Sequence, residues 1–260
     1  MPSVRRAAVV TIDRDGVGDA LARLRAVAER CGVALVDDDD ADIAIVLGGD
    51  GTMLRALARF LGKNVPVIGV NYGRVGFLTA IAGDELDTAL ARVFAGDYRT
   101  VELATLEVTV AGRTSVAIND VVVAGGTLGR MIEVGYSIGG EELGSQPCDG
   151  LICATPAGST AYNLSAQGPI IPLNAPLLAL TPISPFRPRR WRGALLPDTA
   201  RVTIEVIDPE KRPVAAVADH DEVRSVESVD VCMDHSISLN MLFDPGHNLD
   251  ERILREQFGF

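Results

Sequence analysis

Short apolar runs alternate with helical stripes of apolar residues over about the first 95 positions. The runs at 7–12, 43–47 and 65–70 have the length and composition of buried strands. Apolar residues at three- and four-residue spacing predict amphipathic helices over 17–28, 52–61 and 86–94. Glycines follow two of these stripes, at Gly32 and Gly96. Strands that alternate with helices of this length predict βαβ units and a parallel sheet.

The period of the apolar positions changes from helical to two after Tyr98, which is typical of strands that are buried on one face. The predicted strands are 101–110, 116–123, 131–138, 151–154, 202–207, 229–233 and 237–241. Turn residues separate most of them at the intervals of a β-sandwich or a folded sheet. The pattern therefore predicts a second region that is almost entirely β.

These two patterns predict an α/β lobe with a Rossmann-like parallel sheet and a C-terminal, β-sandwich-like lobe. A last helical stripe at Leu249, Ile253, Leu254 and Phe258 is expected to pack back on the first lobe. We therefore expect one domain from residues 1–98 plus 242–260, and a second from residues 99–241. Ligand sites often lie between lobes, so the site is expected there.

Composition and charge argue against several classes of protein. With 47% hydrophobic and 23% charged residues, the chain can bury a core and is not of disordered composition. Its formal net charge of −11 argues against non-specific binding of nucleic acid or of acidic membranes. No apolar run reaches the roughly 18 residues of a membrane span, and the N-terminus lacks a signal-peptide core. We expect a cytoplasmic protein with reduced, non-catalytic cysteines.

The segment Gly48-Gly49-Asp50-Gly51-Thr52 lies where the strand at 43–47 should end and the helix at 52–61 should begin. Glycines there let the main chain approach a ligand closely, and the amides of a helix N-terminus attract phosphate oxygens. A carboxylate in such a cradle repels phosphate unless it has a chemical task or holds a metal. Phosphoryl transfer onto a hydroxyl supplies such a task for Asp50; a structural alternative is that Asp50 caps the helix.

Two later motifs support the first interpretation. Asp149 precedes a strand that leads into a turn and short helix with the sequence TPAGSTAYNLSAQGPI, residues 155–170. Pro156 and Gly158 predict a sharp turn, after which Ser159 or Thr160 is expected to cap a helix. Asn119 and Asp120 offer an amide and a carboxylate suited to a ribose diol or an adenine edge.

GGDGT, the segment NYGRVGFL at 71–78, the mid-chain Asn119-Asp120 and the TPAGSTAY stretch together resemble the NAD kinases. The resemblance runs from residue 48 to about 172 and continues more weakly to the end. It implies phosphorylation of the adenosine-ribose 2′-hydroxyl of NAD to give NADP. It also implies a divalent cation, normally Mg²⁺, with ATP or polyphosphate as the donor, and a homodimer or homotetramer.

The resemblance also implies roles for particular residues. Asp50 would be the catalytic base. Asn119 and Asp120 would hold the adenosine moiety, Asp149 the nicotinamide end, and Arg130 would lie near the ligand phosphates. The remaining binding residues would be Gly49, Gly51, Thr52, Thr160, Ala161, Tyr162 and Ser165.

Three positions depart from the family pattern: Gln167 stands where a glycine is usual, Pro147 where a basic or polar residue is usual, and Asp219-His220-Asp221 where Asp-Gly is usual. Two alternatives stay open. One is a GGDGT-type kinase acting on a lipid or sugar alcohol, and the other is a non-catalytic regulator that binds a dinucleotide. The acidic run Asp37–Asp40 is interpreted as a solvated loop rather than a metal site.

Overall fold

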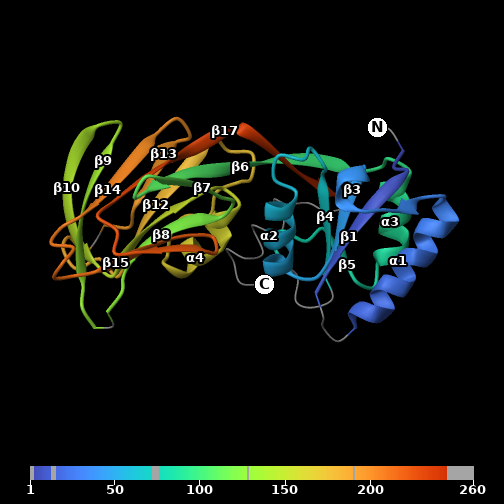
Figure 1. Cartoon of the computed structure of the whole chain (residues 1–260), viewed down its shortest axis with the longest axis horizontal. Helices are drawn as coiled ribbons and strands as arrows, with labels where there is room; N and C mark the ends of the chain where they lie inside the picture. Colours follow the sequence, from blue (N-terminus) through green and yellow to red (C-terminus); the bar gives the residue numbers. More distant parts are fainter. Residues whose placement is uncertain (1–2, 13–15, 72–75, 128, 190, 245–260) are drawn as a thin grey trace. The chain divides into compact units, whose positions relative to one another are not determined.

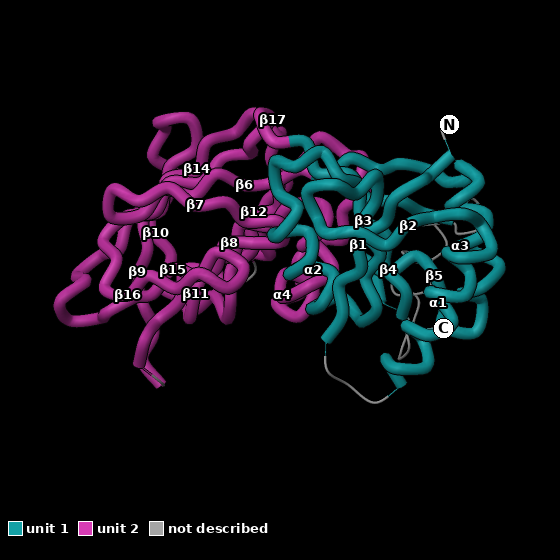
Figure 2. Tube along the Cα trace, turned by 45° about the vertical axis from the view of Figure 1, so that its right-hand side comes forward, with its two compact units in different colours: residues 1–103, 238–260 teal, residues 104–237 magenta. Residues whose placement is uncertain are grey.

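The computed structural model describes residues 3–12, 16–71, 76–127, 129–189 and 191–244. The chain divides into two compact units (Figure 2). Unit 1 comprises residues 1–103 and 238–260, and unit 2, residues 104–237, is inserted between these two parts. The predicted C-terminal helix and residues 72–75 of the NYGRVGFL segment lie outside the described residues. Each unit is described by itself.

Unit 1 contains the predicted parallel sheet (Figure 1). Its elements are β1 (Arg6–Thr11), α1 (Val17–Cys31), β2 (Ala34–Leu35), β3 (Ile43–Leu47), α2 (Asp50–Arg59), β4 (Val67–Asn71), β5 (Ile81–Ala82) and α3 (Leu86–Phe94). The strands pair in parallel in the order β2-β1-β3-β4, and β5 adds to β4. The strand and helix predictions for this lobe are therefore confirmed, with boundaries shifted by a few residues.

Burial explains this arrangement. All five side chains of β3 are buried, as expected for a strand that is covered on both faces. Helix α1 buries one stripe, formed by Ala20, Leu24, Val27 and Ala28, and ends at Gly32, whose φ of 68° lies in the left-handed region. Helices α1 and α3 lie against one face of the sheet and α2 lies against the other (Figure 1).

Unit 2 is almost entirely β, as predicted. Two long strands connect it to unit 1 along the chain: β6 (Arg99–Val110) and β17 (Ser228–Phe243). Its other elements are β7 (Arg113–Ala117), β8 (Asp120–Gly125), β9 (Ile132–Ile138), β10 (Glu141–Cys148), β11 (Gly150–Ala154), α4 (Tyr162–Ser165), β12 (Leu177–Ile183), β13 (Ala194–Pro197), β14 (Arg201–Val206), β15 (Val214–Ala218) and β16 (Asp221–Arg224).

Two layers of strands share one core in this unit. One layer has the order β13-β12-β11-β8-β15-β16, and the other contains β10-β9-β14-β17 with β6 and β7. Buried side chains from both layers form a single cluster, for example Val123, Leu151 and Leu180 from the first and Val134 and Ile204 from the second. Two sheets that enclose a common apolar core make a β-sandwich, which is the predicted architecture.

The structure corrects several strand predictions. The strand predicted at 116–123 is two strands, β7 and β8, with Ile118 and Asn119 between them. The strands predicted at 229–233 and 237–241 are one, β17. The strands absent from the predictions are β2, β5, β10, β12, β13, β15 and β16. None of the helices in the described part of the chain has the length and apolar character needed to cross a membrane.

Candidate functional site

Asp50 is the first residue of α2 and follows directly on the buried strand β3. Its carboxylate does not cap its own helix, because no side-chain hydrogen bond caps α2. Instead, the backbone N–H of Phe77 donates to Oδ2 over 2.8 Å and the N–H of Leu78 donates to Oδ1 over 3.0 Å. The helix-cap interpretation of Asp50 is therefore wrong. The carboxylate is oriented by main-chain amides from another segment.

Gly76 precedes these two amides and makes room for the carboxylate. A Cβ atom at this position would lie 2.2 Å from Asp50 Oδ1 and 2.6 Å from its Cγ. Real Cβ atoms do not approach other heavy atoms this closely, so any other residue would displace either the carboxylate or the segment that holds it. Sequence reasoning missed Gly76 as an individual residue, although it lies within the quoted NYGRVGFL segment.

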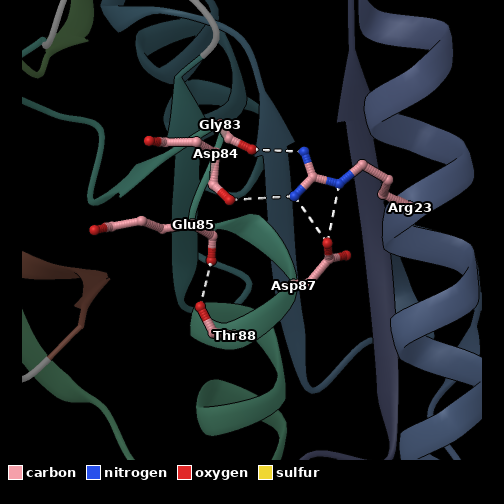
Figure 3. A network of polar contacts seen from close by, with 6 residues as sticks. All are labelled: Arg23, Gly83, Asp84, Glu85, Asp87 and Thr88. Atoms are coloured by element: carbon pink, nitrogen blue, oxygen red, sulfur yellow. Dashed lines mark hydrogen bonds and ion pairs between the residues drawn. The ribbon is translucent and has the colours of Figure 1, made fainter.

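The segment after Leu78 is hydrogen-bonded to other parts of unit 1. Ala80 N–H donates to Gly69 O, and β5 pairs with β4. Further on, the guanidinium of Arg23 donates to Gly83 O over 2.8 Å and binds the Asp87 carboxylate at 2.8 Å (Figure 3). The amides that orient Asp50 thus belong to a segment that is tied to both the sheet and helix α1.

The other GGDGT residues surround Asp50 at the head of α2. Thr52 is only 3% exposed, and its side chain fills the space over Gly48, where a Cβ would meet Thr52 Oγ1 at 2.6 Å. Gly49 is half-buried and Gly51 is exposed, and at neither position would an added Cβ come within 4 Å of another atom in the described part of the chain. A ligand can therefore reach the main chain at Gly51, whereas Thr52 is enclosed.

In unit 2, the connector between β7 and β8 (residues 118–119) lies against the turn that begins at Thr155. Thr155 N–H donates to Asn119 O over 2.9 Å, and Thr155 Oγ1 donates to Ile118 O over 2.7 Å. A Cβ at Gly158 would lie 2.0 Å from Asn119 O. Two of the predicted motifs, Asn119-Asp120 and the TPAGST turn, are therefore in direct contact through their main chains.

The predicted helix at the TPAGST turn is much shorter than expected. Gly158–Thr160 form a single 3₁₀ turn and α4 spans four residues, with no side-chain cap at either start. Ser159 Oγ donates to Pro156 O instead of capping a helix. The expectation that Ser159 or Thr160 caps a helix here is wrong, because the buried side chains hold the turn itself together.

The predicted ligand residues of this turn differ in exposure. Thr160 and Ala161 are half-buried, whereas Tyr162 is 47% exposed and Ser165 is exposed. Beneath them, the buried Asn163 donates to Ser159 O and Pro169 O and accepts from Thr181 Oγ1. This buried network leaves the side chains at 160–162 and 165 at the surface of a rigid turn.

Asp149 and Arg130 lie at the other end of the same strands. The pairing of β8 with β11 places Asp120 opposite Ala154 and Ala124 opposite Gly150, about 13 Å further along at roughly 3.3 Å per residue. Asp149 O accepts from Gly125 N–H beside the Gly150 end, and Arg130 O is near the same glycine. Both side chains are exposed. The structure separates these two residues from the Asn119-Asp120 end.

Two of the departures from the family pattern have a structural setting. Gln167 has a φ of 66°, a left-handed conformation that favours glycine, and its Oε1 accepts from Arg192 Nη1 at 2.5 Å. Pro147 lies in β10, opposite Glu133 of β9. In the acidic run, Asp38 pairs with Arg59 and Asp39 with Lys63, so these two carboxylates bind basic side chains of the protein itself.

Asp120 is the most perturbed carboxyl group of this region. It is 8% exposed, and burial, followed by the nearby charge of Asp219, raises its pKa from 3.8 to about 7. The side chain is therefore partly protonated at neutral pH. Cys153, on the neighbouring strand β11, has a pKa raised to about 12 by burial and stays neutral.

We expect this carboxyl group to make the protein less stable as the pH rises. The folded chain binds the proton of Asp120 more tightly than the unfolded chain, so the stabilisation is complete below about pH 4 and is lost as the pH rises through about 7. In the wild type, the free energy of unfolding should fall by about 2 kcal/mol between roughly pH 5 and pH 8. In Asp120→Asn, this fall should be absent. Urea unfolding of both proteins at the two pH values measures it; equal pH dependence would contradict the assignment.

Comparison with known proteins agrees with the motifs. The family models described as the ATP-NAD kinase N-terminal and C-terminal domains match residues 15–98 and 118–234. The NAD kinase of Caulobacter vibrioides is 45% identical over 261 residues, which cover 99% of this chain and 97% of the relative. The NAD kinase of Hyphomonas neptunium is 49% identical over 229 residues, which cover 86% of this chain and 88% of the relative.

Solved structures show the same fold. Yeast NADH kinase complexed with NADH has a TM-score of 0.84 at 21% identity and covers 100% of this chain and 89% of its own. An NAD kinase from Archaeoglobus fulgidus in complex with ATP has a TM-score of 0.80 at 24% identity. The match covers 98% of this chain and 99% of that protein. Together with the family models and the curated relatives, these findings show that the chain belongs to the NAD kinase family.

Proposed function

We propose that this chain transfers a phosphoryl group from ATP or polyphosphate to the 2′-hydroxyl of the adenosine ribose of NAD, which gives NADP. The observation that carries the chemistry is the Asp50 carboxylate, held by the amides of Phe77 and Leu78 at the start of α2. Family membership supports the substrate, since the curated relatives are NAD kinases. It also disfavours the lipid or sugar alcohol that GGDGT alone left open.

Asp50 is the proposed general base. Each carboxylate oxygen accepts one main-chain hydrogen bond, which leaves it a further lone pair to accept the proton of the 2′-hydroxyl. As the proton leaves, the hydroxyl oxygen attacks the terminal phosphorus of the donor. The bond between this phosphorus and its bridging oxygen breaks, and the bridging oxygen leaves with the rest of the donor (ADP or the shortened polyphosphate). Fixing the base in this way favours the in-line alignment on which phosphoryl transfer depends.

The remaining predicted residues are proposed to bind substrate. Asn119 and Asp120 would hold the adenosine part and Asp149 the nicotinamide part. The turn residues would close over the dinucleotide: Thr160, Ala161, Tyr162 and Ser165. The 13 Å or so between the two ends of β8 and β11 suits an extended dinucleotide better than a single nucleotide. Gly49, Gly51, Thr52 and Arg130 are proposed to lie near phosphates.

Mg²⁺ is proposed to arrive with the phosphoryl donor. The described residues contain no group of three or more His, Cys, Asp or Glu side chains that could hold a metal ion. Mg²⁺ usually keeps several waters and binds through one or two carboxylates plus substrate phosphates, so the absence of a full protein cage among these residues fits this ion. When bound, the ion would neutralise charge on the transferred phosphoryl group, with Asp50 as the nearby carboxylate.

The function is tested by incubating the purified protein with NAD, Mg²⁺ and either ATP or polyphosphate, and by measuring NADP with a strictly NADP-dependent dehydrogenase. NADP formation identifies the reaction, and the active donor identifies the phosphoryl source. Folded protein that binds NAD but forms no NADP from either donor would favour the non-catalytic regulator. Turnover of diacylglycerol in its place would favour a lipid kinase.

Self-association and location complete the proposal. A homodimer or homotetramer and a cytoplasmic location are proposed on the family resemblance alone. Light scattering coupled to size-exclusion chromatography measures the first, and a monomer at micromolar concentration would contradict it.

A further inference from the structure

Asp219 joins two parts of unit 2 that are about 100 residues apart in sequence. It lies in the two-residue turn between β15 and β16, where Ala218 pairs with Asp221, and its φ of 50° is left-handed. Its carboxylate accepts three successive backbone N–H groups from the β7–β8 connector: Ile118 at 2.7 Å, Asn119 at 2.9 Å and Asp120 at 3.3 Å. Asp219 N–H in turn donates to Asp120 O over 3.1 Å.

These hydrogen bonds determine the path of the main chain at the Asn119-Asp120 pair. Ile118 and Asn119 lie between two strands and take no part in either ladder, so their N–H groups need partners from elsewhere. A carboxylate that accepts several backbone N–H groups forms charge-assisted bonds, which are stronger than those of a neutral acceptor. Asp219 therefore replaces the strand pairing that the chain lacks here.

The opposite side of the same connector is held by the TPAGST turn. Thr155 donates from its N–H and its hydroxyl to the carbonyls of Ile118 and Asn119, and Gly158 contacts Asn119 O. The connector amides thus donate to Asp219, and the connector carbonyls accept from Thr155. Asn119 Oδ1, in contrast, is enclosed and accepts no hydrogen bond from the residues that the structure describes.

We propose that Asp219 is a positioning residue for NAD binding, whose carboxylate orients the Asn119-Asp120 pair through the connector amides. The proposal rests on the proposed function, because it assigns Asn119 and Asp120 to the substrate. Asp219 itself accepts only main-chain donors among the contacts described, so it acts through these two residues and not as a ligand.

The charge of Asp219 gives the proposal a second readout. Asp120 lies between β11 and β15, and the titratable groups near it on these elements are Cys153, which points into the sandwich core on the other face of the sheet, and Asp219, in the turn after β15. The thiol is neutral, so Asp219 supplies the negative charge that adds to burial in raising the pKa of Asp120. Replacing Asp219 with a neutral residue should lower that pKa and move any pH dependence of NAD binding to lower pH.

The test compares Asp219→Asn and Asp219→Ala with the wild type by calorimetric titration with NAD, by steady-state kinetics and by thermal unfolding. We expect the dissociation constant and the KM for NAD to rise about tenfold or more in Asp219→Ala, because three charge-assisted hydrogen bonds are lost. The KM for the phosphoryl donor and the kcat at saturating NAD should change by no more than about twofold. Asp219→Asn keeps one acceptor oxygen and should give an intermediate loss.

Asp221→Asn is the matched control. Asp221 belongs to the same β15–β16 hairpin, but its carboxylate pairs with the exposed Arg113, and we expect wild-type NAD binding. NAD affinity is measured directly, so the proposal can be judged even if no NADP forms and the proposed function fails. Folded Asp219→Ala with wild-type affinity would overturn it, as would equal losses in Asp219→Asn and Asp221→Asn. If Asp219→Ala does not fold, Asp219→Asn alone decides, through its affinity and its shifted pH profile.

Discussion

Replacement of Asp50 by asparagine is expected to lower kcat by about 10²–10⁴-fold, which is the usual contribution of a well-placed general base. Asparagine has nearly the same shape but does not accept a proton at neutral pH. NAD affinity should change little, because the Asn119-Asp120 pair and the TPAGST turn are unaltered. The measurement is steady-state NADP formation, together with calorimetric titration of NAD into the variant.

The asparagine variant carries one structural cost, and a second variant controls for it. Both oxygens of Asp50 accept main-chain N–H groups, so the amide nitrogen of asparagine would face a donor and cost about 1–3 kcal/mol of stability. Gly76→Ala keeps the carboxylate but displaces it, since the new Cβ would lie 2.2 Å from Asp50 Oδ1, and it too should lose most of its kcat. Asp39→Asn, at an exposed ion pair with Lys63, should keep wild-type kcat.

A variant Asp50→Asn that retained more than about a tenth of the wild-type kcat would contradict the role as base. Asp50 would then be only the anchor of the segment at Phe77 and Leu78. Loss of activity in Asp50→Asn with full activity in Gly76→Ala would show that the carboxylate is needed but its position is not.

Gly158→Ala is expected to have the second large effect. The added Cβ would lie 2.0 Å from Asn119 O and 2.3 Å from its carbonyl carbon, and both are main-chain atoms that a side-chain rotation cannot move. Separating the TPAGST turn from the connector should cost about 3 kcal/mol of unfolding free energy, at the upper end of overpacking effects. It should also weaken NAD binding at least about tenfold, since the Asn119-Asp120 pair and the turn predicted to close over the dinucleotide move apart.

Urea unfolding and NAD titration test this prediction, with Gly18→Ala as the control. Gly18 lies in the first turn of α1, has no atom within 4 Å of an added Cβ and has no left-handed φ, so alanine there should be neutral or slightly stabilising. Wild-type stability and affinity in Gly158→Ala would show that the turn can move away from Asn119 without consequence.

Elements with strong local patterns could be predicted from the sequence, and those that depend on distant partners could not. The strand β3, the GGDGT junction and the helix α2 follow from a five-residue apolar run and a helical stripe. The break at Ile118 and Asn119 does not, because the apolar residues on both sides of Asn119-Asp120 give the pattern of one continuous strand. What interrupts the ladder is Asp219 on one side and Thr155 on the other, and neither is local in sequence.

Two of the unpredicted strands, β15 and β10, have a weak local pattern. β15 contains three alanines in five residues, a weak strand signal that pairing with β8 overrides. β10 has five exposed residues in succession at the outside of its sheet, so no apolar pattern marks it.

The candidate site shows a comparable division. Asp50 follows from the chemistry of a carboxylate in a phosphate cradle, whereas the binding residues depended on the family resemblance. Gly76 and Asp219 were missed as site-forming residues because their importance lies in contacts with distant parts of the sequence, Asp50 for Gly76 and the connector amides for Asp219. A single sequence carries no mark of such a contact.

The insertion of unit 2 within unit 1 has a consequence for synthesis on the ribosome. The last strand of the unit 1 sheet is the end of β17, where Met241 pairs with Val67 of β4. That segment is translated only after the whole of residues 104–237, a delay of roughly 7–27 s at about 5–20 residues per second. During this interval, the strand that later pairs with the edge of β4 at Val67 has not yet been synthesised. The nascent chain therefore contains every residue of unit 2 before it contains the segment that completes the sheet with which it began.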